Sequence, residues 1–135
     1  TIAGSGTSGF ADGFGLEASF QLPDGIAFTA DRQVALVTEK SNHRIRALNV
    51  SSGKVTTIAG SADFAYVNGA GAYALFNTPA GIAVSPDGLT ALVPSALNYV
   101  IRSIDLCPKI DASCPSGFLN DVYEARSGVK TIAGD

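Results

Sequence analysis

The single histidine of the chain, His43, is the first residue whose type could do chemistry. An imidazole can transfer protons near neutral pH or ligate a metal ion. A zinc site needs three or four protein ligands, however, and no cluster of cysteine, histidine or carboxylate residues surrounds His43 in the sequence. We therefore expect no metal site, no catalytic residue and no cofactor, and we interpret His43 as a structural residue.

Two glycine-rich stretches, Asp12-Gly13-Phe14-Gly15 and Asn68-Gly69-Ala70-Gly71, resemble the start of a cation-binding loop. Calcium loops continue with further oxygen ligands, and no Asp-x-Asp-x-Asp series follows either stretch. We interpret both as turns, because glycine adopts positive φ without strain. Hydrolase chemistry has no support, since the Gly-x-Ser-x-Gly pattern is absent.

Three further residues bear on the cellular compartment. Cys107 and Cys114 are the only cysteines and stand in one irregular, proline-flanked stretch, so we predict a disulfide between them, worth about 2–3 kcal/mol. In a cytosolic protein the same residues would be free thiols. Asn49-Val50-Ser51 is a glycosylation sequon, and we predict a glycan on Asn49 if the protein is secreted by a eukaryote.

A fixed period organises the whole chain. The run Thr-Ile-Ala-Gly begins at Thr1, recurs 56 residues later at Thr57, and recurs again 74 residues later at Thr131. The first shift holds without a gap as far as Arg46 and Arg102. The second copy is 18 residues longer, and we assign the excess to an insertion at residues 107–128.

Each copy is predicted to contain four short strands. The strands expected in the first copy are residues 25–28, 34–38, 45–50 and 55–59. These runs are rich in β-branched and aliphatic residues, and Gly, Pro, Asp and Ser separate them. No segment has a sustained helical period. Four strands per repeat, repeated in tandem, predict an all-β fold of β-propeller blades.

The run Asn42-His43-Arg44-Ile45-Arg46, preceded by Gly25-Ile26-Ala27-Phe28 and followed by Val55-Thr56-Thr57-Ile58-Ala59-Gly60, resembles the NHL repeat, which is named for its Asn-His-Leu signature. The second copy is weaker: it keeps Asn98, Ile101 and Arg102 but has Tyr99 in place of the histidine. Where the family usually has Ala-Asp, the two copies have Thr38-Glu39 and Pro94-Ser95. WD repeats fit poorly, because the chain has no tryptophan.

The resemblance implies two four-stranded antiparallel blades and an additional outer strand. Residues 1–4 would be the outer strand of a preceding blade, residues 5–60 the first blade, and residues 61–135 the second blade. It also implies that the signature residues are structural, with His43 lying in a strand. Two blades are fewer than a propeller needs, so we expect further blades from the same polypeptide or from identical chains, as a closed oligomer or an open polymer.

The charge of the chain narrows its possible partners. Arg44, Arg46 and Arg102 could form a basic surface for RNA, but nine Lys and Arg residues against twelve Asp and Glu residues give a net charge of −3. We therefore expect no nucleic acid partner, and we expect these arginines to pack between blades or to pair with carboxylates. Apolar runs are of strand length, so no membrane insertion is expected either.

Three functions remain after these exclusions. The first is an extracellular or cell-surface, non-catalytic module that binds protein or glycan partners or assembles through its own blades. The second is a fragment of a propeller enzyme, a lyase or hydrolase, whose catalytic residues lie in other blades. The third is an RNA-binding propeller, which the acidic charge disfavours.

Overall fold

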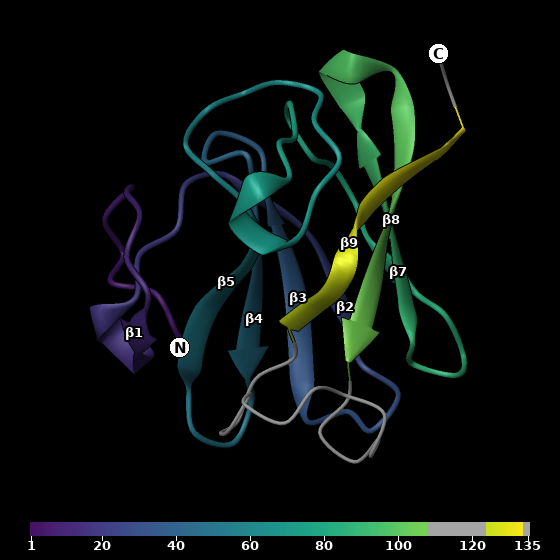
Figure 1. The fold of residues 1–135 in the computed structure, drawn as a ribbon. Coiled ribbons are helices and arrows are strands. Elements are labelled where there is room, and N and C mark those ends of the chain that lie inside the picture. The colour runs from purple at the N-terminus through teal and green to yellow at the C-terminus, as the bar shows by residue number, and fades with distance from the viewer. Residues whose placement is uncertain (108–123, 134–135) are drawn as a thin grey trace.

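The computed structural model describes residues 1–107 and 124–133, which form two antiparallel β-sheets lying side by side (Figure 1). The strand orders are β1-β5-β4-β3-β2 and β6-β7-β8-β9. In chain order the strands are β1 (Gly13–Phe14), β2 (Pro23–Phe28), β3 (Val34–Glu39), β4 (Arg44–Asn49), β5 (Lys54–Gly60), β6 (Ala83–Val84), β7 (Thr90–Ser95), β8 (Val100–Cys107) and β9 (Glu124–Ala133). The predicted all-β fold of two four-stranded antiparallel blades is confirmed, and β2 to β5 are called blade 1 and β6 to β9 blade 2.

Helical structure in the described residues is confined to three short 3-10 turns. They are η1 (Gly15–Glu17), η2 (Gly71–Tyr73) and η3 (Ala96–Asn98). Within residues 1–107 and 124–133, no helix has the length and apolar character needed to cross a bilayer.

Strand pairing continues into both ends of the insertion predicted at residues 107–128. β8 extends to Cys107, β9 begins at Glu124, and these two residues pair across the hairpin. Continued pairing satisfies backbone donors and acceptors that an irregular loop would leave to solvent. The predicted disulfide lies outside the described residues, because Cys114 falls in the undescribed stretch 108–123.

The predicted strand at residues 1–4 is not formed in this structure. A strand needs a hydrogen-bonded neighbour, and the blade to which residues 1–4 would belong is not part of these 135 residues. Their placement nevertheless follows the repeat. The carbonyl of Ile2 lies beside Gly15 as the carbonyl of Ile58 lies beside Gly71, and Ala3 packs on the apolar cluster of blade 1.

The loop before each inner strand folds back over the outer strand of the same blade. In blade 1 this loop contributes β1, in which Gly13 pairs with Val55. In blade 2 the equivalent residues, Gly69 and Val129, exchange two backbone hydrogen bonds of 3.3 and 2.6 Å. This pairing covers part of the outer edge of each sheet, where unpaired backbone groups would otherwise invite non-specific strand addition.

The main apolar core lies between the two sheets and is made by both blades. From blade 1 it takes alternate side chains of β3 and β4 and two consecutive ones of β5, and from blade 2 side chains of β7, β8, β9 and the loop before β6. Its buried members are Val34, Leu36, Ile45, Ala47, Ile58, Ala59, Ala74, Phe76, Ala91, Val93, Ile104, Leu106 and Val129. The blades are therefore held together by burial of apolar area, the dominant favourable contribution to folding.

Close approach of the two inner edges depends on glycine. A Cβ atom added to Gly25 would lie 2.5 Å from the Cα of Gly81, a distance no real contact tolerates. Gly81 itself has φ +70°, a backbone conformation that favours glycine. Both glycines of the Pro-Asp-Gly and Pro-Ala-Gly sequences are thus needed where blade 1 meets blade 2.

Candidate functional site

Each blade buries one arginine beneath the loop that precedes its inner strand. In blade 1 this residue is Arg46 of β4, whose side chain is completely shielded from solvent. Its guanidinium carbon lies 4.9 Å from the ring centre of Phe10 and 5.1 Å from that of Phe20. Aromatic faces attract a cation, so the two rings stabilise the charge that burial would otherwise disfavour.

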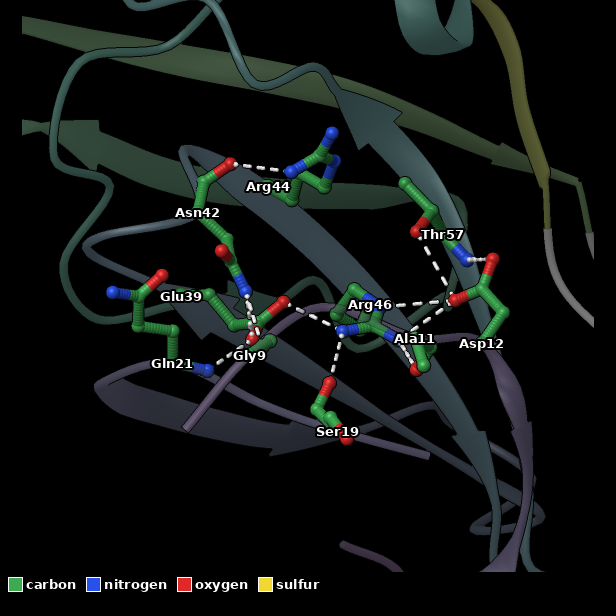
Figure 2. Close-up of polar contacts among 10 residues, drawn as sticks. All are labelled: Gly9, Ala11, Asp12, Ser19, Gln21, Glu39, Asn42, Arg44, Arg46 and Thr57. Carbon is green, nitrogen blue, oxygen red and sulfur yellow. Dashed lines mark hydrogen bonds and ion pairs between the residues drawn. The ribbon is translucent and has the colours of Figure 1, made fainter. Parts of the chain in front are cut away.

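Two carboxylates and two backbone carbonyls accept the hydrogen bonds of Arg46 (Figure 2). Arg46 Nη2 donates to Asp12 Oδ1 at 2.7 Å and Nη1 donates to Glu39 Oε2 at 2.8 Å. Nε also donates to Asp12 Oδ1, and the carbonyls of Ala11 and Ser19 accept from Nη2 and Nη1. Every guanidinium nitrogen of Arg46 therefore has an acceptor.

The same carboxylates fasten the loop to the strands. Glu39, also fully buried, accepts through Oε1 from the backbone N–H of Gln21 and from Asn42 Nδ2, both at 2.8 Å. Asp12 Oδ2 accepts from the backbone N–H of Thr57 in β5. Asp12, which the sequence reading assigned to a turn, is thus also a ligand of Arg46 and of the outer strand.

Blade 2 repeats the buried arginine without any carboxylate. Arg102 is also completely buried, with its guanidinium carbon 5.3 Å from the ring centre of Tyr66 and 5.0 Å from that of Phe76. Its acceptors are the carbonyls of Leu75 and Val67, each at 2.8 Å, and the amide oxygen of Asn68 at 3.0 Å.

Two substitutions between the copies explain the difference. Asn68 stands in the position of Asp12, and Ser95 stands in the position of Glu39. Ser95 takes over only part of the role of Glu39: its hydroxyl accepts from the backbone N–H of Asn77 and from Asn98 Nδ2. Among the described side chains, Arg102 Nε is buried with no hydrogen-bond partner, and burial lowers the pKa of this guanidinium.

The signature residues of the first copy lie at the junction of the two blades. His43 was predicted to lie in a strand, but it lies in the turn between β3 and β4, with φ +54°. Its Nδ1 accepts a hydrogen bond of 3.1 Å from the backbone N–H of Thr78, and its ring lies 5.5 Å from that of Phe64. Nδ1 must be unprotonated to accept this bond; burial, reinforced by the charge of Arg44, lowers the pKa of His43.

The remaining signature residues serve the blade itself. Arg44 lies 3.8 Å from the ring centre of Phe10 and donates to the carbonyl of Asn42, and burial lowers its pKa. Ile45 is in the apolar core. Asn98 donates to the carbonyl of Ala65, as Asn42 donates to that of Gly9. The prediction that the arginines pair with carboxylates holds for Arg46, whereas Arg102 uses carbonyls and an amide.

A second polar contact joins the blades beside the glycine pair. Asp24 Oδ2 accepts from the backbone N–H of Gly81 at 3.1 Å, while Oδ1 forms an ion pair of 2.6 Å with Lys40. The hydrogen bond from Lys40 holds the pKa of Asp24 below its usual value. Blade 2 has Ala80 in place of Asp24, so it cannot offer this contact to a following blade.

The outer face of blade 2 exposes the apolar positions that blade 1 buries at the junction. Leu36 is 0% exposed, whereas its equivalent Leu92 is 40% exposed; Ile58 is 4% exposed, whereas Ile132 is 56% exposed. A groove of about 290 Å³ opens on this face, lined mainly by apolar side chains that include Tyr99. We call this surface the end face; it comprises Leu92, Pro94, Leu97, Tyr99, Ile101 and Ile132.

The opposite surface of blade 1 shows the complementary exposure. Ile26 and Phe28 of β2 are 64% and 54% exposed, whereas their equivalents Ile82 and Val84 pack against the core between the blades. Leu22, in the loop before β2, is also exposed. We call Leu22, Ile26 and Phe28 the start face.

The described residues offer no arrangement for metal chemistry, since no group of three or more His, Cys, Asp and Glu side chains lies together in them. The site that the geometry does offer is a pair of apolar surfaces, one at each end of the two-blade array. Tandem four-stranded blades that pack through such surfaces define a segment of a β-propeller.

Similar proteins place this segment in a family, although no family model matches the chain. It is 30% identical over 108 residues to NHL repeat-containing protein 2 of Gallus gallus and 29% identical over 108 residues to the Homo sapiens protein of the same name. It is 35% identical over 95 residues to Protein SUPPRESSOR OF QUENCHING 1, chloroplastic, of Arabidopsis thaliana. The chain belongs to the NHL-repeat family.

These matches involve most of this chain but a small part of each relative. The 108 residues are 79% of this chain and 15% of either NHL repeat-containing protein 2, and the match to the Arabidopsis protein covers 70% and 9%. Among solved structures, an auxiliary nutrient binding protein from Bacteroides thetaiotaomicron superposes with a TM-score of 0.61 at 24% identity, over 73% of this chain and 26% of that one. This likeness supports the fold.

Proposed function

We propose that this NHL-repeat segment is a non-catalytic, extracellular or cell-surface module that works by assembly. Its end face and start face bind further blades, and the array so built presents loops to protein or glycan partners. The observation that carries the proposal is the exposure of junction positions at both ends. Leu92 and Ile132 on one end, and Ile26 and Phe28 on the other, repeat positions that are shielded where the two blades meet.

Burial of these side chains supplies the driving force for assembly. Covering a large apolar side chain stabilises a complex by about 1.5–3 kcal/mol, and contiguous apolar surfaces of this kind are typical of binding sites. Backbone pairing along the outer strand is an unsuitable route, because the folded-back loops already occupy the edges of β5 and β9 at Val55 and Val129. Association is therefore face to face.

The experiment is sedimentation of the 135-residue chain over a range of micromolar concentrations. We expect a discrete oligomer or a filament whose proportion rises with concentration. A well-folded monomer throughout the range would contradict assembly as the function.

The extracellular location draws support from the sequon and is tested separately. Asn49 is the last residue of β4, and its Oδ1 accepts from the backbone N–H groups of Ser51 and Ser52, so it lies at the end of the β4–β5 hairpin. A glycan attached to Nδ2 leaves these Oδ1 bonds in place. Mass spectrometry of the native protein should find glycosylated Asn49; an unmodified residue in secreted eukaryotic material would contradict this prediction.

A further inference from the structure

The contacts between blade 1 and blade 2 serve as a template for the end face, because the two blades are related by a shift of 56 residues. A residue of blade 1 that meets blade 2 has an equivalent on blade 2, 56 positions later. The residue it meets has an equivalent on blade 1, 56 positions earlier. Each contact at the internal junction therefore names a pair of residues that would meet if the end face of one chain received the start face of another. One place is claimed twice: residues 131–133 of the first chain would lie where residues 1–3 of the second chain lie beside Gly15, so residues 1–4 of the second chain have to move aside.

The polar contact at the internal junction becomes an apolar one under this shift. His43, which accepts from Thr78, is replaced by Tyr99, and Thr78 is replaced by Leu22. Tyr99 is 84% exposed and Leu22 is 63% exposed. The imidazole acceptor of the internal pair is replaced by the ring of Tyr99, and Thr78, which donates through its backbone N–H, is replaced by the apolar Leu22, so the equivalent pair offers two side chains that could pack.

The backbone presents both pairs in the same way. His43 and Tyr99 have φ values of +54° and +59°, and Thr78 and Leu22 have values of +54° and +47°. Non-glycine residues seldom adopt this left-handed conformation. Its recurrence at all four positions means that Tyr99 and Leu22 are aimed as His43 and Thr78 are.

The second polar contact of the junction changes in a matched way on both sides. Gly81 receives its acceptor from Asp24 of the other blade, since Pro94 on its own blade has no hydroxyl group. Gly25 already donates to Thr38 Oγ1 of its own blade at 2.9 Å and needs no acceptor from outside. The equivalent of Asp24 on the end face is Ala80, which offers none. The end face therefore offers no acceptor for this N–H group, and the start face needs none, because Thr38 already accepts from Gly25.

The glycine pair is preserved at such a contact. At the internal junction Gly25 approaches Gly81; at a contact between chains Gly81 would approach Gly25, so both positions again lack a side chain. The turns beside β2 and β6 differ. Gly88, whose added Cβ would lie 2.9 Å from Ala30, is replaced by Arg32, and Ala30 by Pro86, so a contact between chains is wider there than the internal junction.

We propose that the end face of blade 2 receives the start face of a second copy of this chain, head to tail, with Leu22 entering the groove beside Tyr99 and Ile26 and Phe28 covering Leu92. This inference rests on the assembly proposed above and names its partner and its register. The contact is heterologous, because two different surfaces meet. Each chain therefore has one donor surface and one acceptor surface.

Two single substitutions test this arrangement through complementation. In Tyr99→Lys a charge blocks the end face, and in Leu22→Lys a charge blocks the start face; both residues are exposed, so the blades should fold as in the wild type. Each variant alone retains one usable surface but no partner for it, so we expect association to weaken at least about tenfold. An equimolar mixture should form a species of twice the single-chain mass and nothing larger, since only one functional contact exists.

Tyr73→Lys is the matched control. Tyr73 is as exposed as Tyr99 but lies in η2, outside both faces, and its equivalent in blade 1 is Glu17, so the position accepts charge. This variant should associate as the wild type does. Unimpaired association of either blocked variant, or a mixture that remains monomeric, would overturn the head-to-tail contact while leaving assembly itself intact. A wild-type chain that never associates would overturn both proposals.

Discussion

The two blades bury the same residue at the same place but compensate its charge differently. In blade 1 Arg46 lies between two carboxylates, one of them fully buried with it. In blade 2 Arg102 is equally buried and meets carbonyls, an amide oxygen and two aromatic rings. The fold around both arginines is alike. Each blade therefore needs the N–H groups of a guanidinium, which tie the preceding loop to the sheet, more than it needs a particular acceptor.

The difference also shows which residues depend on the arginine. Glu39 is a buried carboxylate whose desolvation is offset by Arg46, so arginine and acid must be kept or lost together. Ser95 carries no charge, and blade 2 tolerates it because Tyr66, Phe76 and the carbonyl dipoles stabilise the cation. Blade 1 is thus the more sensitive to loss of its arginine.

Removal of each arginine gives the largest expected difference between the blades. In Arg46→Met the carboxylates of Glu39 and Asp12 remain without their cation, and we expect a loss of about 3–5 kcal/mol in the free energy of unfolding. In Arg102→Met only neutral acceptors are left, and the expected loss is about 1–3 kcal/mol. Urea unfolding of both variants measures this. Equal losses would show that charge compensation does not distinguish the blades.

Alanine at each glycine of the junction tests the inner edges. The added methyl group of Gly25→Ala would collide with the backbone of Gly81, so we expect a cost of about 1–3 kcal/mol or more. The methyl group of Gly81→Ala meets nothing within 4 Å, and the variant suffers only the strain of φ +70°, about 1–2 kcal/mol. Thermal unfolding should rank Gly25→Ala as the less stable. The reverse order would mean that backbone strain outweighs the close approach.

Asp12 and Asn68, the equivalent acceptors of Arg46 and Arg102, can be exchanged, which should reduce the difference in how strongly the two arginines stabilise their blades. Asn68→Asp gives Arg102 a charged acceptor in place of the amide oxygen that now accepts from Nη2, and we expect stabilisation of about 1 kcal/mol. Asp12→Asn should have the opposite sign and a similar size, because it removes one charge-assisted acceptor of Arg46. Chemical denaturation of both single variants checks the pair. Destabilisation by Asn68→Asp would contradict the account given for blade 2.

The smallest effect concerns His43 and acidity. Because its pKa is lowered in the folded protein, the unfolded chain binds a proton more readily, so stability is complete above about pH 6.5 and falls as the pH drops toward the folded-state pKa. The expected loss is about 1 kcal/mol or less, the value of one hydrogen bond. His43→Asn keeps an acceptor and suits the positive φ, so it should remove this pH dependence below about pH 6.5. An unchanged profile in the variant would assign the dependence to other groups.

The architecture was predictable because the period repeats whole strands and turns. Matching runs 56 residues apart fixed both blades, and β-branched segments between turn residues located the strands of blade 1 to within about two residues. The strand at residues 1–4 was predicted from the same period and is not formed, since hydrogen bonding requires a neighbour and similarity of sequence does not provide one.

The buried arginine networks were predictable only in outline. Carboxylate pairing followed from the residue type, but Asp12 and Arg46 are 34 positions apart, and nothing local reveals their contact. A usable signal was present: Asp12 and Arg46 change to Asn68 and Arg102 under the same shift, which keeps an oxygen acceptor with an arginine. The strand expected at His43 followed from the NHL resemblance, and the turn there was not predicted because a left-handed backbone in a non-glycine residue cannot be read from local composition.

The glycine contact at the inner edges has a geometric consequence for the whole array. Two backbones without side chains touch at β2 and β6, whereas at the outer strands β5 and β9, which also contact each other, η2 packs against both (Figure 1). The space between the sheets is therefore a wedge, closed at its tip by the glycine contact of the inner edges and occupied by η2 on the outer side. Successive wedges turn a row of blades into an arc, and the difference in thickness between the tip and the outer side of the wedge sets its radius. A methyl group at the tip, as in Gly25→Ala, would flatten that arc and enlarge any ring built from it.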